Sequence, residues 1–148
     1  MGIEKDINQP HFSTEYRKGI VNLTYTFNWM SERVKKILDG EDITSQQFNI
    51  LRILRGAGKP LSTLQIRQRM LDKMSDTSRI VDRLLIKGLV KKVTSSADKR
   101  MVDVSISDKG RKLLEKLDKA DDKIDSILGK LSDQEIKTLN RLLDKIRE

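Results

Sequence analysis

Residues 75–79 place three hydroxyls, one carboxylate and one guanidinium in consecutive positions: Ser75, Asp76, Thr77, Ser78 and Arg79. Hydroxyl and carboxylate groups exchange hydrogen bonds with the polar edges of bases, and a guanidinium binds guanine or a phosphate. The chemistry that these groups support is recognition by hydrogen bonding. Serine and aspartate are also common helix caps, and capping is compatible with contact to a ligand.

A second group lies at residues 98–100, where Asp98 precedes Lys99 and Arg100. A carboxylate two positions before an arginine can hold its guanidinium in a bidentate pair. An arginine held in this way stays extended, and the negative potential of a narrow DNA minor groove attracts it. We therefore expect Lys99 and Arg100 to contact a polyanion, with Asp98 supporting Arg100.

Residues for catalysis or metal binding do not form a recognisable pattern. The chain has no cysteine and a single histidine, His11, without a serine–histidine–acid or metal-ligand arrangement around it. The glycines at 56 and 58 are too closely spaced for a phosphate-binding loop. We predict no catalytic residue, no metal site and no cofactor, and therefore a protein that is not an enzyme.

Apolar periodicity predicts the helices that must position these groups. Residues 13–39 form a long helix with apolar side chains three and four residues apart. Ser/Thr-x-x-Gln/Glu capping boxes at Thr44, Ser62 and Ser132 predict three further helix starts. Ser75 is expected to cap a helix that runs to about residue 87, where Gly88 ends it.

After Gly88 the apolar period changes to two. Residues 90–96 are rich in strand formers and residues 101–107 alternate, which predicts a β-hairpin with its tip at 97–100. The chain returns to helix near Asp108, and apolar side chains continue at helical spacing to Leu128. The order of elements predicts a mainly α fold, a winged helix-turn-helix with a two-stranded β wing.

Positive charge is concentrated in the middle of the chain. Residues 44–112 hold 16 Lys/Arg and 6 Asp/Glu, a balance of +10, whereas the remaining residues hold 14 and 16, a balance of −2. A basic block between nearly neutral arms indicates a polyanionic partner. The second helix of a helix-turn-helix enters the DNA major groove with its first residues on the base edges. We expect double-stranded DNA, contacted by residues 75–79, by Ser62 and by the wing.

The apolar stripes of the first and last helices exceed what one small core can cover. Uncovered stripes would favour aggregation, and a two-fold interface between copies removes that exposure. We therefore expect a homodimer, with residues 1–40 as an N-terminal dimerisation helix and residues 41–112 as the DNA-binding lobe. Residues 113–148 are expected to form the C-terminal dimerisation helices.

Residues 44–114 resemble the MarR family of bacterial regulators, above all in the stretch SRIVDRLLIKGLVKKVTSSADKRMVDVSISDKGRKLL. The stretch is similar to the family's recognition helix, its G-L-V strand entry, its D-x-R wing and its S/T-x-K-G helix start. The resemblance implies a dimer on a pseudo-palindromic operator, with Arg100 in the minor groove and Asp98 orienting it. It also implies repression that is relieved when a small phenolic or lipophilic effector lodges between the lobe and the dimerisation helices.

The sequence departs from the family pattern in the recognition helix, which is expected to begin at Ser75, and in the turn before it. Thr77 stands where the family usually has an apolar residue, and residues 71–73 lack a glycine that is often found there. Without cysteine, the chain is not one of the family's peroxide sensors. Tyr25 and Trp29, four residues apart on the first helix, are candidates for lining an effector pocket, although such spacing is also typical of core residues.

Two further interpretations stay open from the sequence. A winged helix can bind a protein or RNA without any small-molecule effector, and the residues do not distinguish a repressor from an activator. No basic segment followed by an apolar stretch opens the chain, and no run of 18 apolar residues occurs in it. We expect a cytoplasmic protein with no membrane partner.

Overall fold

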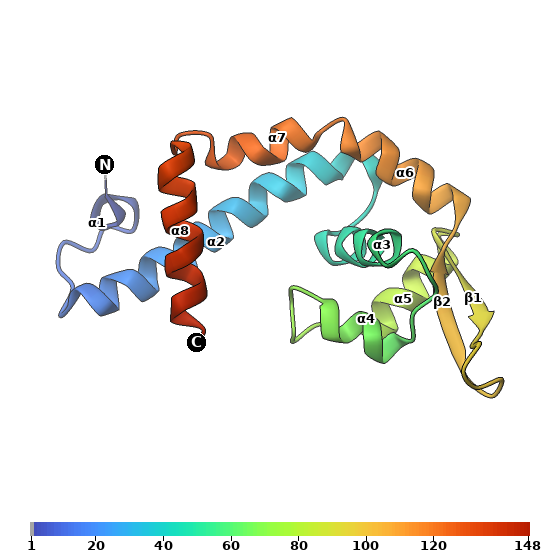
Figure 1. The fold of residues 1–148 in the computed structure, drawn as a ribbon. Helices are drawn as coiled ribbons and strands as arrows, with labels where there is room; N and C mark the ends of the chain where they lie inside the picture. The colour runs from blue at the N-terminus through green and yellow to red at the C-terminus, as the bar shows by residue number, and fades with distance from the viewer. Residues whose placement is uncertain (1) are drawn as a thin grey trace.

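The computed structural model describes residues 2–148, and its elements are arranged along one long helix, α2 (Glu15–Leu38). A short helix, α1 (Ile3–Asp6), lies at one end of α2, and a lobe with a β-hairpin lies at the other (Figure 1). The hydroxyl of Thr14 caps α2 by accepting a hydrogen bond from the backbone N–H of Arg17, at 3.1 Å. The last residue, Leu38, is fully buried in the lobe core.

Three helices and the hairpin build the lobe. They are α3 (Ser45–Ala57), α4 (Thr63–Arg69), α5 (Thr77–Ile86), β1 (Val90–Thr94) and β2 (Val102–Ile106). Their apolar faces share one core, whose fully buried side chains include Ile50, Leu51, Leu61, Ile66, Leu84 and Leu114. Because close-packed interiors resist deformation, this core fixes α5 and the hairpin relative to each other.

The hairpin pairs β1 and β2 antiparallel, from Val90 opposite Ile106 to Thr94 opposite Val102. The segment before α4 joins this sheet, because Leu61 and Val104 exchange backbone hydrogen bonds of 2.9 and 2.7 Å. The wing is therefore tied by its backbone to the start of α4. Its tip extends away from the rest of the lobe (Figure 1).

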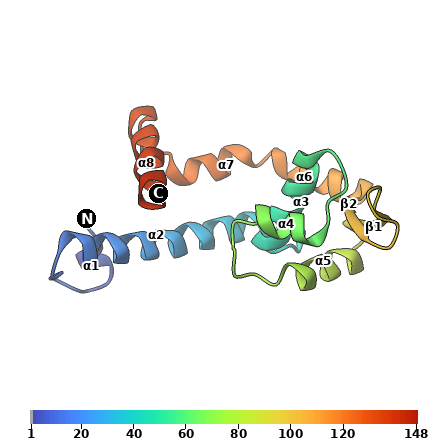
Figure 2. The same ribbon diagram turned by 60° about the horizontal axis from the view of Figure 1, so that its bottom comes forward.

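After the wing the chain returns along α2 as a broken helix. The pieces are α6 (Asp108–Asp118), α7 (Asp121–Asp125), η2 (Ser126–Leu128) and α8 (Asp133–Ile146), and a further short turn, η1 (Asp39–Glu41), lies between α2 and α3. In both views α6 and α7 follow α2, and α8 turns out of their line (Figures 1 and 2). None of the helices among residues 2–148 combines the length and the apolar character that crossing a membrane requires.

The predicted fold class is confirmed, since the chain is mainly helical with a two-stranded antiparallel wing. All three predicted capping boxes form, at Thr44, Ser62 and Ser132. The single helix expected from Asp108 to Leu128 is wrong: the helix breaks after Asp118, without a glycine or proline to signal the break. The helix α1, whose Ile3 is buried, was not expected from the sequence.

Candidate nucleic-acid interface

The start of α5 is fixed by the side chains of two aspartates. Asp76 is the N-cap, and its Oδ1 accepts a hydrogen bond from the backbone N–H of Arg79 at 3.2 Å. Asp72 Oδ1 accepts from the N–H of Met74 at 3.0 Å, and the Ser75 hydroxyl donates to the carbonyl oxygen of Asp72 at 2.7 Å. The cap expected at Ser75 therefore lies one residue later, because the Ser75 hydroxyl is engaged within the preceding turn.

The side chains of α5's first turn divide between the surface and the interior. Asp76, Ser78 and Arg79 are exposed, whereas Thr77 is 3% exposed. Thr77 lies four and seven residues before Val81 and Leu84, the other buried residues of α5, so it shares the helix face that packs against the lobe. Thr77 is therefore the one residue of this predicted contact turn whose side chain is buried in the structure, and its contact with DNA stays a prediction. Among the described residues, the Thr77 Oγ1 finds no hydrogen-bond partner.

The structure brings the start of α4 beside the start of α5. Thr63, Leu64 and Arg67 of α4 line one surface hollow of about 440 Å³ with residues 75–78. Ser62, expected at this surface, is half-buried, and its hydroxyl accepts from the Gln65 N–H at 3.1 Å within the capping box. Sequence reasoning missed Arg67, although an arginine in the helix before the reading helix was a visible signal.

The wing tip presents an exposed but anchored guanidinium. Arg100 Nε donates to Asp98 Oδ1 and its Nη2 donates to Asp98 Oδ2, both at 3.3 Å. The Arg100 backbone N–H also donates to Asp98 Oδ1, at 3.0 Å, and these bonds lower the pKa of the Asp98 carboxyl. The Arg100 side chain is 90% exposed, and Lys99 beside it is exposed too. An arginine held this way keeps its charge directed outward.

A cavity of about 660 Å³ lies between α2 and the lobe, and we call it the lobe cavity. Phe27, Met30 and Val34 line it from α2, and residues 71–73 line it from the turn that leads into α5. The carboxamide Oδ1 of Asn49, also in its lining, accepts from the N–H of Leu71 at 3.0 Å. The lobe cavity is therefore contiguous with the turn that sets the position of Asp76.

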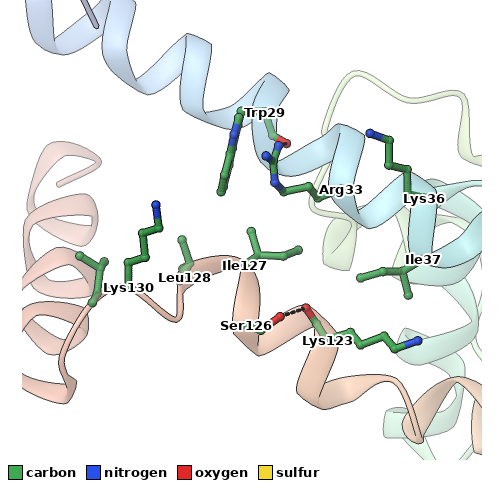
Figure 3. A pocket seen from close by; sticks show the side chains of 10 residues that line it. Trp29, Arg33, Lys36, Ile37, Lys123, Ser126, Ile127, Leu128 and Lys130 are labelled. Carbon is green, nitrogen blue, oxygen red and sulfur yellow. Dashed lines mark hydrogen bonds between the residues drawn. The ribbon is translucent and has the colours of Figure 1, made fainter. Parts of the chain in front are cut away.

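A second cavity, of about 620 Å³, lies between another face of α2 and the α7–η2 segment, and we call it the cationic cavity (Figure 3). Trp29 lines it, whereas Tyr25 lines neither cavity. Tyr25 and Trp29 therefore do not share either of these two cavities, and their common role in an effector pocket stays a prediction. The face of α2 toward the lobe carries residues 27, 30 and 34, and helical spacing turns residues 25 and 29 away from it.

A capped helix with an exposed polar first turn, a preceding short helix and an arginine-tipped wing define a winged helix-turn-helix DNA-binding protein. Residues 41–101 match the model of the MarR family. The chain is 30% identical over 111 residues to the HTH-type transcriptional regulator MgrA of Staphylococcus aureus, covering 75% of this chain and 74% of that protein. It is 29% identical over 127 residues to the multiple antibiotic resistance protein MarR of Salmonella typhimurium, covering 84% and 88%. The chain belongs to the MarR family of DNA-binding transcriptional regulators, which are not enzymes.

Solved structures share the fold. A mutant of MarR from E. coli, complexed with operator DNA, superposes with a TM-score of 0.76 at 23% identity, covering 84% of this chain and 89% of that one. Bordetella bronchiseptica BpsR, whose structure concerns regulation of DNA binding by 6-hydroxynicotinic acid, superposes with a TM-score of 0.77 at 23% identity, covering 85% and 90%.

Proposed function

We propose that this chain is a ligand-responsive repressor that binds a pseudo-palindromic operator as a homodimer. The observation that carries the proposal is the Asp98–Arg100 pair: a 90% exposed guanidinium is held by two hydrogen bonds at the tip of a wing. Ordering an exposed arginine costs side-chain entropy and buries almost no apolar surface. The negative potential of a DNA minor groove attracts arginine. A side chain that is already ordered loses less conformational entropy when it binds there.

In the proposed complex, the first turn of α5 enters the major groove. Asp76, Ser78 and Arg79 are the exposed polar groups that reach base edges, with Ser75 beside them. Ser62 and Arg67 contact the flanking phosphates from α4, and Lys99 and Arg100 contact the adjacent groove from the wing. The operator DNA bound to the E. coli relative of the same fold supports this arrangement.

The proposed homodimer follows from apolar side chains that the described chain leaves uncovered. On α2, Ile20 and Phe27 are 63% and 62% exposed, and on α8 Leu142 and Ile146 are 45% and 68% exposed. Burying such a side chain contributes about 1.5–3 kcal/mol. In a two-fold dimer each of these residues is buried in both copies, so its contribution counts twice. Sedimentation at micromolar concentration tests the dimer, because a single species at the 17.1 kDa monomer mass would contradict it.

The proposed effector is a small phenolic or lipophilic molecule in the lobe cavity. Its lining is mainly apolar, and residues 71–73 form one wall. A ligand that displaces this wall also moves the turn held by Asp72 and the N-cap at Asp76. The distance between the two α5 helices of the proposed dimer then changes. The regulation of DNA binding in BpsR by 6-hydroxynicotinic acid supports an effector of this size.

Selection of bound duplexes from a random pool tests the DNA-binding proposal. We expect an inverted repeat whose half-sites lie about one DNA turn, 10–10.5 base pairs, apart. Affinity should fall by about 10³–10⁵-fold between 50 and 200 mM salt if six to ten phosphates are neutralised. RNA of the same sequence and the separated DNA strands are the controls. Recovery of no duplex, or equal binding of RNA, would contradict the proposal.

A further inference from the structure

The C-terminal end of α5, the recognition helix, is held by polar contacts as well as by the core. Lys87 is the C-cap of α5. Its carbonyl oxygen accepts a hydrogen bond from Lys109 Nζ at 2.8 Å, and the Gly88 carbonyl oxygen accepts one from the Ser107 hydroxyl at 2.6 Å. Carbonyl groups at the end of a helix lack partners within it, and these bonds supply them from another element. The end of α5 is thereby fixed to the start of α6.

The Lys87 side chain extends in another direction, to the segment between α2 and α3. Its Nζ donates to the backbone carbonyl oxygen of Asp42 and, at 3.2 Å, to the carboxamide Oε1 of Gln47. The Asp42 carboxylate is fully exposed and lies 3.9 Å away, so the carbonyl and the carboxamide are the principal partners. Gln47 is 3% exposed, and its Oε1 also accepts from the Thr44 N–H at 3.1 Å in the capping box of α3. One ammonium therefore joins the end of α5 to the start of α3.

Asp42 lies at the junction between the long helix α2 and the lobe. It directly follows η1, which begins where α2 ends, and its backbone φ of +52° lies in the left-handed region. Leu38, the last residue of α2, is buried in the lobe core just before this junction. The carbonyl group that Lys87 contacts therefore belongs to the segment that connects the helix assigned to the dimer with the lobe.

These contacts add a preferred direction to the packing of α5. Val81 and Leu84 hold α5 against the core, and apolar attraction is non-directional, whereas hydrogen bonds require alignment. α5 has ten residues and is therefore about 15 Å long. A tilt of about 10° about its C-terminal end displaces its first turn by about 2.6 Å, close to the step of about 3.4 Å between base pairs. A contact that limits this tilt determines which bases the first turn meets.

We infer that Lys87 is a positioning residue for operator recognition. By joining the end of α5 to the junction at Asp42, it fixes the angle between α5 and α2, and with it the half-site spacing that the dimer accepts. The inference rests on the proposed homodimer and its inverted-repeat operator. Lys87 acts without touching DNA, because its ammonium is directed at Asp42 and Gln47.

Binding of the full chain to a series of duplexes tests the inference. The duplexes keep the two selected half-sites and vary their separation by one base pair at a time, which moves one half-site by about 3.4 Å and about 34° around the axis. Lys87→Met removes the ammonium and keeps the apolar stem. The wild type should bind the selected spacing about tenfold or more tightly than either neighbour, and Lys87→Met should narrow this ratio to about threefold or less.

Further variants separate positioning from charge. Lys91→Met is the matched control, because Lys91 is an exposed lysine of β1 in the same lobe, and this variant should keep the wild-type ratio between spacings. Lys87→Arg keeps the charge and the donors and should recover part of the preference. Lys87→Gln is too short to contact the Asp42 carbonyl group and should behave as Lys87→Met does, even if the latter folds poorly. The dependence of log affinity on log salt should keep its wild-type slope in Lys87→Met, because no phosphate contact is lost.

A spacing preference that is present in the wild type and unchanged in Lys87→Met and Lys87→Gln would overturn the inference and leave the proposed function intact. An equal loss of affinity at every spacing, with a salt slope reduced by about one, would also overturn it, because Lys87 would then contact a phosphate. A wild type without any preference among spacings would contradict the inverted-repeat operator itself, and this inference with it. Circular dichroism establishes that each variant retains its helices.

Discussion

Arg55 of α3 and Asp118, the last residue of α6, form a bidentate pair across 63 positions of sequence. Arg55 Nη1 donates to Asp118 Oδ2 at 2.7 Å, and Nη2 donates to Oδ1 at 2.9 Å. α6 is the segment that leads from the wing toward α7 and α8, so the pair links the DNA-binding lobe to the helices of the proposed dimer. A second pair, Lys116 with Glu41 at 2.7 Å, joins α6 to the segment before α3.

Removing either partner of the Arg55–Asp118 pair should destabilise the fold modestly. The side chains are 31% and 44% exposed, and partly exposed ion pairs contribute about 0.5–1 kcal/mol, bidentate ones toward the upper end. Urea unfolding of Arg55→Gln, Asp118→Asn and the double variant gives the coupling energy directly. Additive single effects would show that the pair contributes no net stability.

Acidification should remove the contribution of this pair. The hydrogen bonds from Arg55 lower the pKa of Asp118 below its ordinary value of about 3.9. A lowered folded-state pKa gives stability that is present above the unfolded-state pKa and is lost as the pH falls through the folded-state pKa. The difference in unfolding free energy between wild type and Asp118→Asn should therefore shrink below about pH 4. A difference that grows in acid would contradict this assignment.

Gly110 is required by a close backbone approach at the start of α6. A Cβ on this residue would lie 2.3 Å from the Leu89 carbonyl oxygen and 2.8 Å from Ile106 Cγ1, so backbone must move to admit alanine. We expect Gly110→Ala to cost about 1–3 kcal/mol or more. Gly56→Ala is the matched control: nothing lies within 4 Å of its added Cβ in α3, and it should stabilise by about 0.4–1 kcal/mol. Thermal unfolding of both variants measures these opposite signs.

Arg100→Ala should weaken operator binding and leave thermal stability unchanged, since the side chain is exposed at the wing tip. Arg100→Lys keeps the charge but not the two bonds to Asp98, and Asp98→Asn keeps the arginine but loosens it. We expect both to lie between Arg100→Ala and wild type in an electrophoretic mobility assay. An unfolded Arg100→Ala variant would mark the residue as structural.

Local signals accounted for most of the fold. Capping boxes and apolar spacing are properties of neighbouring residues, so Thr44, Ser62 and Ser132 indicated helix starts that the structure confirms. The Asp98–Arg100 pair was equally local, because both groups lie on the same tight turn. Such features are predictable since they do not depend on how the elements pack.

Features that depend on packing could not be predicted from sequence spacing. Ser75 and Asp76 are both good caps, and only the turn held by Asp72 decides between them. Thr77 is buried because it shares a face of α5 with Val81 and Leu84, and the position of that face is set by packing in the lobe. Tyr25 and Trp29 share a helix face, but which face of α2 meets the lobe is set by the position of the whole lobe.

Thr77→Val tests this burial and separates it from a role in base reading. The Thr77 side chain is 3% exposed, and its hydroxyl lacks a partner among the described residues. A buried unsatisfied hydroxyl costs about 1–3 kcal/mol, and valine replaces it with a methyl group of similar size. We therefore expect Thr77→Val to raise the unfolding free energy by about 1 kcal/mol and to leave operator affinity unchanged. Ser78 is exposed, so Ser78→Ala should lower operator affinity and leave the unfolding free energy unchanged. If Thr77→Val instead weakens binding without stabilising the chain, the threonine hydroxyl contacts DNA and α5 must rotate when it binds.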